Sequence, residues 1–142
     1  MQRLACLLFA ACLALPALAE EAGPGEERFG AYTVHYSAFT STYLQPQVAQ
    51  QLGLLRGKQL GVLNVTVLKD GQPQPAQVSG TLRSLTGTAQ PLDFRTLREK
   101  GAVYTVAQYP VPQQETRIFE LKVQAGGVSH RFSFRQELFP DP

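Results

Sequence analysis

Cysteine is almost absent from this sequence. The only two, Cys6 and Cys12, lie within the first nineteen residues, and there is no tryptophan anywhere in the chain. The chain after residue 19 therefore has no disulfide, no thiolate nucleophile and no cysteine-based metal site. Its stability has to come from the packing of its other side chains.

The chain also lacks a strong excess of either charge. Lysine and arginine total 13, aspartate and glutamate total 11, and the two signs are mixed along the sequence. Nucleic acids and anionic membranes are bound by clustered basic charge, so the composition argues against both as partners. No stretch after the N-terminal one is long and apolar enough for a membrane-spanning helix, which needs about 20 residues.

The N-terminus has the three-part form of a secretory signal. Arg3 is the basic start, residues 4–15 are an apolar run, and small residues precede the expected cut after Ala19. We expect a signal peptide over residues 1–19 and a periplasmic mature protein. The alternative is lipidation of Cys12, because the residues before it partly match a lipoprotein cleavage site.

The mature chain has the length of one domain. Residues 20–28 are acidic, contain glycine and proline, and offer few apolar side chains, so we expect a flexible leader there. Structure should begin at Phe29, and residues 29–142 should form a single domain.

Most of this domain has the pattern of β-strands. In residues 32–39 apolar and polar side chains alternate with a period of two, which places Val34 on the buried face and His35 on the other. A short helical segment should follow, because Pro46 suits a first helical turn and Gly53 suits a helix end. In that segment Leu55 would share the apolar face. The further strand-like runs are residues 60–68, 77–85, 91–98 and 102–111.

The clearest element is a hairpin around Gly126 and Gly127, because glycine pairs suit two-residue turns that need positive φ. The register it predicts pairs Val123 with His130, Leu121 with Phe132, and Phe119 with Phe134. The opposite face carries polar and charged residues, namely Glu120, Lys122, Arg131, Ser133 and Arg135. We expect the apolar face to form a central part of the core and the charged face to be solvated.

About seven strands with frequent turn signals predict an all-β fold. We expect an immunoglobulin-like antiparallel β-sandwich with one short helix or helical turn. The cysteine pair and the tryptophan of antibody domains are missing, so the prediction concerns the architecture only.

Several motifs resemble a known family. They are VHYSAF at residues 34–39, ST.L.P..A at residues 41–49, NVTVLKDG at residues 64–71 and FELKV at residues 119–123. Together they resemble a family of proteobacterial secreted domains of unknown function, number four-four-two-six of that series (DUF4426), over nearly the whole mature chain. This chain departs from the family pattern at Leu52, Gly57 and Thr105. The resemblance implies a small secreted bacterial domain with no assigned activity.

A serine hydrolase would have to use His35 with Ser41, and the sequence supports this poorly. Extended strands keep His35 and Ser37 about 7 Å apart, Ser41 could return only across a turn, and no acid is placed to orient the histidine. The simpler interpretation is that His35 hydrogen-bonds locally and fixes the turn after its strand.

A metal site would have to combine His35 with His130 and an acid such as Asp70 or Asp93, residues without any close ligand spacing. Arg56 could bind an anionic group, but capping of backbone carbonyls is the simpler role.

Asn64 begins a match to the glycosylation pattern, yet a strand interior is a poor acceptor. We expect Asn64 to bond a neighbouring strand or turn.

The function that these observations favour is a non-enzymatic periplasmic module that binds an unknown periplasmic or envelope protein. We expect no catalytic residues, no metal ligands and no cofactor. The predicted recognition surface comprises His35, Tyr36, Phe39, Ser41, Pro46 and Arg56. The alternatives are a small-molecule or metal-binding domain and, third, a hydrolase using His35 and Ser41.

Overall fold

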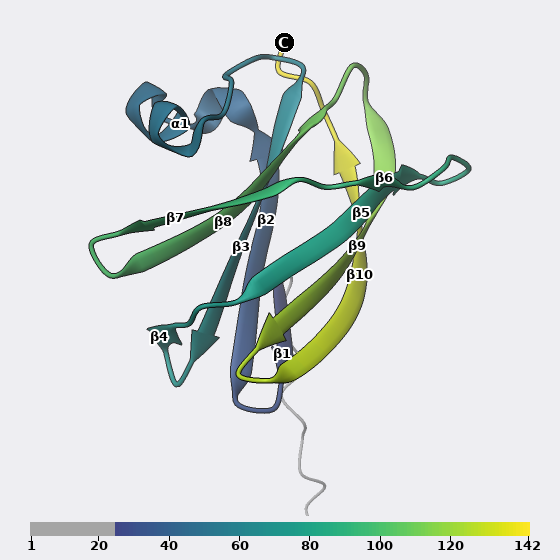
Figure 1. The fold of residues 1–142 in the computed structure, drawn as a ribbon. Helices are drawn as coiled ribbons and strands as arrows, with labels where there is room; N and C mark the ends of the chain where they lie inside the picture. Colours follow the sequence, from purple (N-terminus) through teal and green to yellow (C-terminus); the bar gives the residue numbers. More distant parts are fainter. Residues whose placement is uncertain (1–24) are drawn as a thin grey trace, which may run out of the picture.

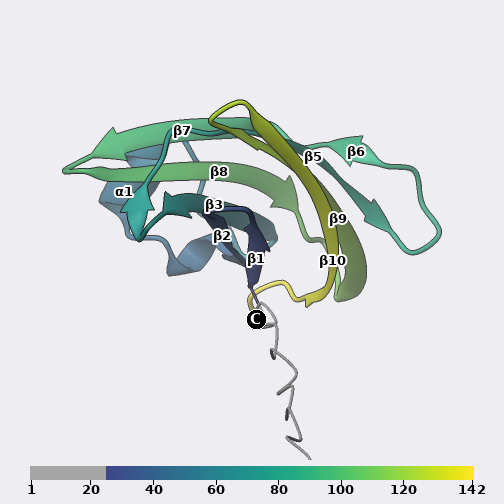
Figure 2. The ribbon, with the colours of Figure 1, turned by 90° about the horizontal axis from the view of Figure 1, so that it is seen from below.

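The chain folds into two antiparallel sheets packed face to face, with a short α-helix and one turn of 3-10 helix (Figures 1 and 2). The computed structural model describes residues 25–142, apart from the side chain of Glu99. The elements in chain order are β1 (Glu26–Phe29), β2 (Tyr32–Thr40), η1 (Ser41–Tyr43), α1 (Pro46–Leu52), β3 (Leu60–Lys69), β4 (Gln72–Pro73), β5 (Gln77–Ser84), β6 (Gln90–Pro91), β7 (Phe94–Glu99), β8 (Ala102–Pro110), β9 (Glu115–Ala125) and β10 (Val128–Leu138). The expected β-sandwich with one short helix is confirmed.

The larger sheet has the strand order β1-β2-β3-β8-β7, with β4 added to β3, and the smaller sheet has the order β10-β9-β5-β6. The smaller sheet curves around one side of the larger sheet (Figure 2). The hairpin that joins the end of β7 to the start of β8 extends past the smaller sheet (Figure 1), so the sandwich is open on that side.

The period-two pattern of β2 gives the orientation that the sequence predicted. Val34 and, on β3, Val65 face the smaller sheet and are 0% and 1% exposed. His35 points to the opposite, outer face of the larger sheet, where it is exposed beside Thr66 of β3.

Helix α1 begins and ends where the sequence predicted. Pro46 takes the first helical position, and Gly53 ends the helix in the left-handed conformation at φ 67°. The helix covers one end of the outer face through an apolar cluster that includes Leu52, Leu54 and Val62. The prediction for Leu55 was wrong, because the turn at Gly53 buries Leu54 and leaves Leu55 69% exposed.

The hairpin of β9 and β10 has the predicted register. Val123 pairs with His130, Leu121 with Phe132, and Phe119 with Phe134, and both turn glycines have positive φ. Phe119 and Leu121 are buried, as expected. Phe132 and Phe134 are only partly buried, because β10 is an edge strand and fewer side chains cover it.

The structure corrects three boundaries. Strand β1 pairs with β2 from Glu26 onward, so the last residues of the expected leader 20–28 belong to the sheet. The expected strand 91–98 is two strands, because the chain leaves the smaller sheet after β6 and enters the larger sheet at β7. The strand expected over residues 60–68 extends to Lys69, which pairs with Gln72 of β4.

The predicted signal peptide, the cut after Ala19, the Cys12 alternative and the start of the leader lie outside the described residues. Within residues 25–142, no helix has the length and apolar character needed to cross a membrane.

Candidate functional site

The structure separates the residues of the predicted recognition surface. His35 is exposed in the middle of the outer face, Tyr36 points into the sandwich, where its ring stacks on Phe134 at 4.2 Å, and Phe39 is partly buried beside α1. His35 makes no hydrogen bond within residues 25–142, so the prediction that it fixes the turn after β2 was wrong.

The turn after β2 is fixed by Ser41 instead. Its side chain is 0% exposed. The hydroxyl donates to the carbonyl of Gly57 at 2.9 Å and accepts from the amide N–H of the same residue at 2.9 Å. Ser41 thus joins η1 to the loop that follows α1.

Three more contacts bring the C-terminal residues to the same end of the sandwich. The Thr42 hydroxyl donates to an Asp141 carboxylate oxygen at 2.7 Å, and the Asp141 amide donates to the carbonyl of Lys58 at 2.7 Å. Thr40 donates to the carbonyl of Phe139 at 3.3 Å. We call these contacts and the Ser41–Gly57 pair the end lock. The sequence reasoning missed them, because nothing in a local pattern indicates a contact across 99 positions.

Arg56 takes the simpler of its two predicted roles. Its guanidinium donates to the carbonyl of Thr42 at 3.0 Å, and the residue is otherwise exposed. It therefore holds the loop after α1 against η1 and still presents part of its charged group to solvent.

The predicted hydrolase pair does not meet. Ser41 lies six positions after His35, roughly 20 Å of extended chain, and its hydroxyl is buried and bonded to Gly57. The Oδ1 atom of Asn64 is buried without a hydrogen-bond partner among the described residues, so the predicted bond from Asn64 to a neighbouring strand is absent for that atom.

The two histidines lie on opposite sides of the larger sheet. His130 faces the core side, where its Nε2 lies 2.9 Å from a carboxylate oxygen of Glu27 and its ring stacks on Phe29. His35 is on the outer face. Among residues 25–142 there is no group of three histidine, cysteine, aspartate or glutamate side chains that could hold a metal ion.

Burial raises the pKa of two tyrosines. For Tyr109 burial is the main cause, and the nearby Arg117 opposes it. For Tyr36 burial again comes first, and the negative charge of Glu27 raises the pKa further. Both hydroxyls therefore stay protonated at neutral pH, and neither is a base or nucleophile there.

Exposed apolar side chains gather around the end lock. Tyr43 is 78% exposed, Leu55 69% and Phe139 53%. Tyr43 and Phe139 border one groove of about 220 Å³, while Leu55 adjoins Arg56. We call Tyr43, Pro46, Leu55, Arg56 and Phe139 the end surface; Pro46 and Arg56 belong to the surface that the sequence predicted.

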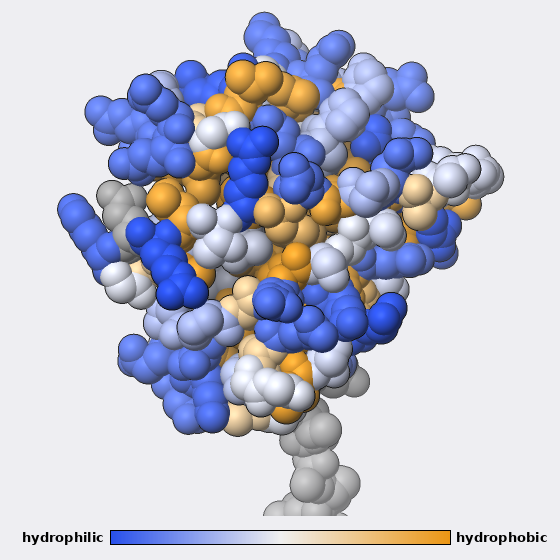
Figure 3. All heavy atoms as spheres, in the orientation of Figure 1, coloured by the Kyte–Doolittle hydropathy of each residue, from blue (hydrophilic) through white to orange (hydrophobic). Residues whose placement is uncertain are grey.

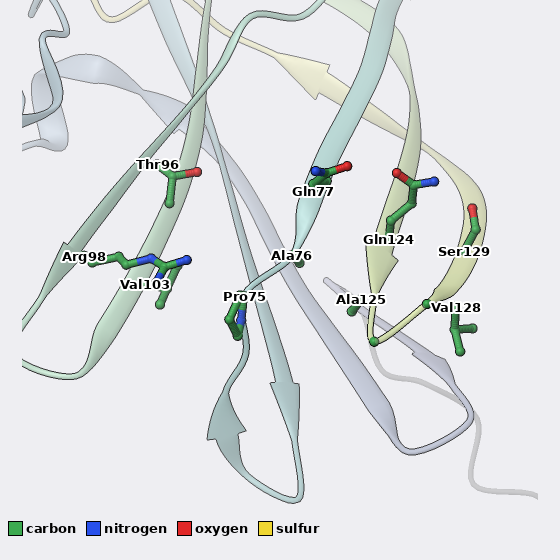
Figure 4. A pocket seen from close by; sticks show the side chains of 12 residues that line it. Pro75, Ala76, Gln77, Thr96, Arg98, Val103, Gln124, Ala125, Val128 and Ser129 are labelled. Carbon is green, nitrogen blue, oxygen red and sulfur yellow. The ribbon is translucent and has the colours of Figure 1, made fainter.

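A second concave region lies at the open side of the sandwich. This cleft of about 730 Å³ is bordered by Thr96, Arg98 and Val103 on one side and by Gln77 and residues of the β9–β10 turn on the other (Figure 4). Arg98 has no ion-pair partner within the described part of the chain. Hydrophilic side chains cover much of the face seen in Figure 3, and apolar ones show between them.

Comparison with known proteins gives a family. The model of DUF4426, a domain of unknown function, matches residues 26–141. A crystal structure of a DUF4426 family protein from Pseudomonas aeruginosa PAO1 has a TM-score of 0.78 and 47% sequence identity, covering 83% of this chain and 98% of that chain. No curated protein matches the chain.

Two structures of FetP from uropathogenic Escherichia coli share the fold. A copper-bound variant has a TM-score of 0.61 at 12% identity and covers 81% of this chain and 94% of its own. FetP as isolated after expression in the periplasm of E. coli has a TM-score of 0.58 at 10% identity, covering 81% and 93%. At this level of identity the likeness concerns the fold alone.

Proposed function

We propose that this chain, which belongs to the DUF4426 family as its motifs predicted, is a non-enzymatic module that binds a protein partner. The function of that family is unknown. The binding site is the end surface, and the module works in the periplasm. The observation that carries the proposal is the concentration of exposed apolar side chains around Arg56 on a locked part of the fold.

The chemistry of the end surface supports a protein partner. Aromatic residues and arginine are enriched where protein interfaces gain most of their binding energy. Tyr43 and Phe139 offer aromatic rings, and Arg56 offers the guanidinium N–H groups that Thr42 does not use. The end lock fixes the backbone beneath them, which lowers the entropy that binding would otherwise cost.

Two observations support a module without catalysis. Ser41 is buried with its hydroxyl bonded to Gly57, and His35 has no acid or hydroxyl partner within residues 25–142.

The periplasmic location rests on the signal-like N-terminus, and protein purified from a periplasmic fraction should begin at Glu20.

Small-molecule binding is the second candidate, and the open cleft favours it. Its volume of about 730 Å³ lies in the range of small-ligand sites. One variant of FetP, which shares the fold, has copper bound, so copper belongs among the ligands to be titrated.

The test is capture from envelope extract by the mature chain, with binding confirmed on the purified partner. Tyr43→Ala and Phe139→Ala should each weaken the complex at least tenfold while the melting temperature stays the same. Tyr104→Ala is the matched control, because Tyr104 is an exposed tyrosine on β8 that does not belong to the end surface. A partner that binds Tyr43→Ala and Phe139→Ala as tightly as it binds Tyr104→Ala would contradict this site. Saturable copper or small-molecule binding without any protein partner would favour the second candidate.

A further inference from the structure

The outer face of the smaller sheet brings together residues that are far apart in the sequence. Ser79 on β5 pairs with Lys122 on β9, which pairs with Arg131 on β10. The next row along the strands consists of Thr81, Glu120 and Ser133. The sequence predicted that the β9 and β10 residues of these rows form a solvated face, but it gave no indication that β5 would add two hydroxyl groups to them.

Lys122 and Arg131 lie directly opposite each other, which is unfavourable for two like charges on neighbouring strands. Neither side chain has an ion-pair partner among residues 25–142. The one carboxylate of the next row, Glu120, lies 3.3 Å from the guanidinium Nε of Arg83. Arg135, two rows further along β10, adds another cation to the same face. Within residues 25–142 this face therefore has a local excess of positive charge, because its carboxylate Glu120 is already paired with Arg83.

The same residues border a hollow of about 700 Å³. Its lining includes Ser79, Thr81, Lys122, Arg131 and Ser133, together with Glu120. The Thr81 hydroxyl is buried there and has no hydrogen-bond partner among the described residues. Buried polar groups nearly always have a partner, so this hydroxyl is available to a bound group.

We propose that this hollow binds an oxyanion of the phosphate type carried by a ligand. A negative charge between Lys122 and Arg131 would turn their repulsion into two charge-assisted hydrogen bonds. Three hydroxyls supply further donors, and a phosphate group has three strong acceptor oxygens to receive them. A carboxylate has only two oxygens and would leave donors unused. The site is separate from the end surface and does not depend on the function proposed for that surface.

Inorganic phosphate is the first probe, titrated into the mature chain at constant ionic strength with chloride as the reference. Saturable binding is expected, and Lys122→Gln and Arg131→Gln should each weaken it about tenfold or more, as loss of a hydrogen bond to a charged group implies. Thr81→Val should weaken it by a smaller factor. Lys58→Gln, which removes an exposed charge away from the hollow, should have no effect. Without phosphate, Lys122→Gln should raise the melting temperature, because it removes the repulsion.

Vesicles distinguish the source of the phosphate group. If vesicles rich in phosphatidylglycerol bind the chain through Lys122 and Arg131 and vesicles of phosphatidylcholine do not, the ligand is an anionic lipid headgroup. If phosphate binds and neither vesicle does, the ligand is a soluble phosphorylated molecule. The proposal is overturned if phosphate binding does not saturate, or if Lys122→Gln and Lys58→Gln change it equally.

Discussion

Gly61 on β3 and Tyr109 on β8 lie directly opposite each other, and the tyrosine ring occupies the space that a side chain at residue 61 would need. Gly61 has no positive φ, so glycine stands there for the close approach of the ring and not for the backbone conformation. The ring is 4% exposed and meets Phe119 edge-on at 5.5 Å. This contact connects the larger sheet to the centre of the smaller one.

Gly61→Ala should therefore destabilise the fold by about 1–3 kcal/mol, the usual cost of an extra methyl group in a packed core. Urea denaturation measures the change. The control is the same substitution in a Tyr109→Ala background, where the methyl group has room. If the cost is the same in both backgrounds, the ring is not the group that opposes a side chain at residue 61.

The buried hydroxyl of Tyr109 has no hydrogen-bond partner among the described residues. Tyr109→Phe should consequently leave stability at neutral pH unchanged or raise it by up to about 1 kcal/mol, because a buried unpaired polar group is costly. A loss of more than about 1 kcal/mol in the same denaturation experiment would mean that the hydroxyl has a partner in solution.

The raised pKa of Tyr109 also predicts how stability changes at alkaline pH. In the unfolded chain tyrosine loses its proton near pH 10, whereas the buried hydroxyl keeps it, so the folded state binds more protons there. Stability should be complete below about pH 10 and fall as the pH rises above it. The slope should be smaller in Tyr109→Phe. Tyr36, whose pKa is also raised, should contribute in the same direction, and an unchanged slope in both phenylalanine variants would contradict the shifts.

The register and the two faces of the hairpin of β9 and β10 were predictable because their information is local, whereas the partial burial of Phe132 and Phe134 depends on the edge position of β10. The glycine pair sets the turn, and the period of two then assigns each side chain to a face. By the same logic the sequence predicted His35 to be exposed and α1 to run from Pro46 to Gly53. The crossing of the chain between sheets was not predictable, because residues 91–98 have one continuous strand-like pattern.

The functional surfaces were less accessible to sequence reasoning. The contact of Thr42 with Asp141 and the row formed by Ser79, Lys122 and Arg131 depend on which strands become neighbours. No local pattern contains that information. Composition indicated only that the charges are mixed. The pairing of β9 with β10 then placed Lys122, Arg131 and Arg135 on one face of the smaller sheet.

Ser41 provides a test of the end lock. Ser41→Ala should cost about 1–3 kcal/mol, since it leaves the amide and carbonyl of Gly57 without the partner they have in the fold. Ser37→Ala is the matched control, because Ser37 is an exposed serine on β2, the strand that leads into η1; it should change stability by less than about 0.5 kcal/mol. Equal effects of the two substitutions in urea denaturation would show that the end lock does not depend on this hydroxyl.

The fully buried and the partly buried phenylalanine of the hairpin can be distinguished by truncating each to alanine. Phe119 is 0% exposed and packs against Tyr109 and Phe134, so Phe119→Ala should cost about 3–5 kcal/mol. Phe132 is partly buried on the edge strand β10, and Phe132→Ala should cost clearly less, because part of its ring already contacts water. Urea denaturation at two protein concentrations measures both. If Phe132→Ala lowers the free energy of unfolding as much as Phe119→Ala does, the burial seen here is contradicted. If the loss for Phe132→Ala also grows with protein concentration, a second copy of the chain covers β10 in solution.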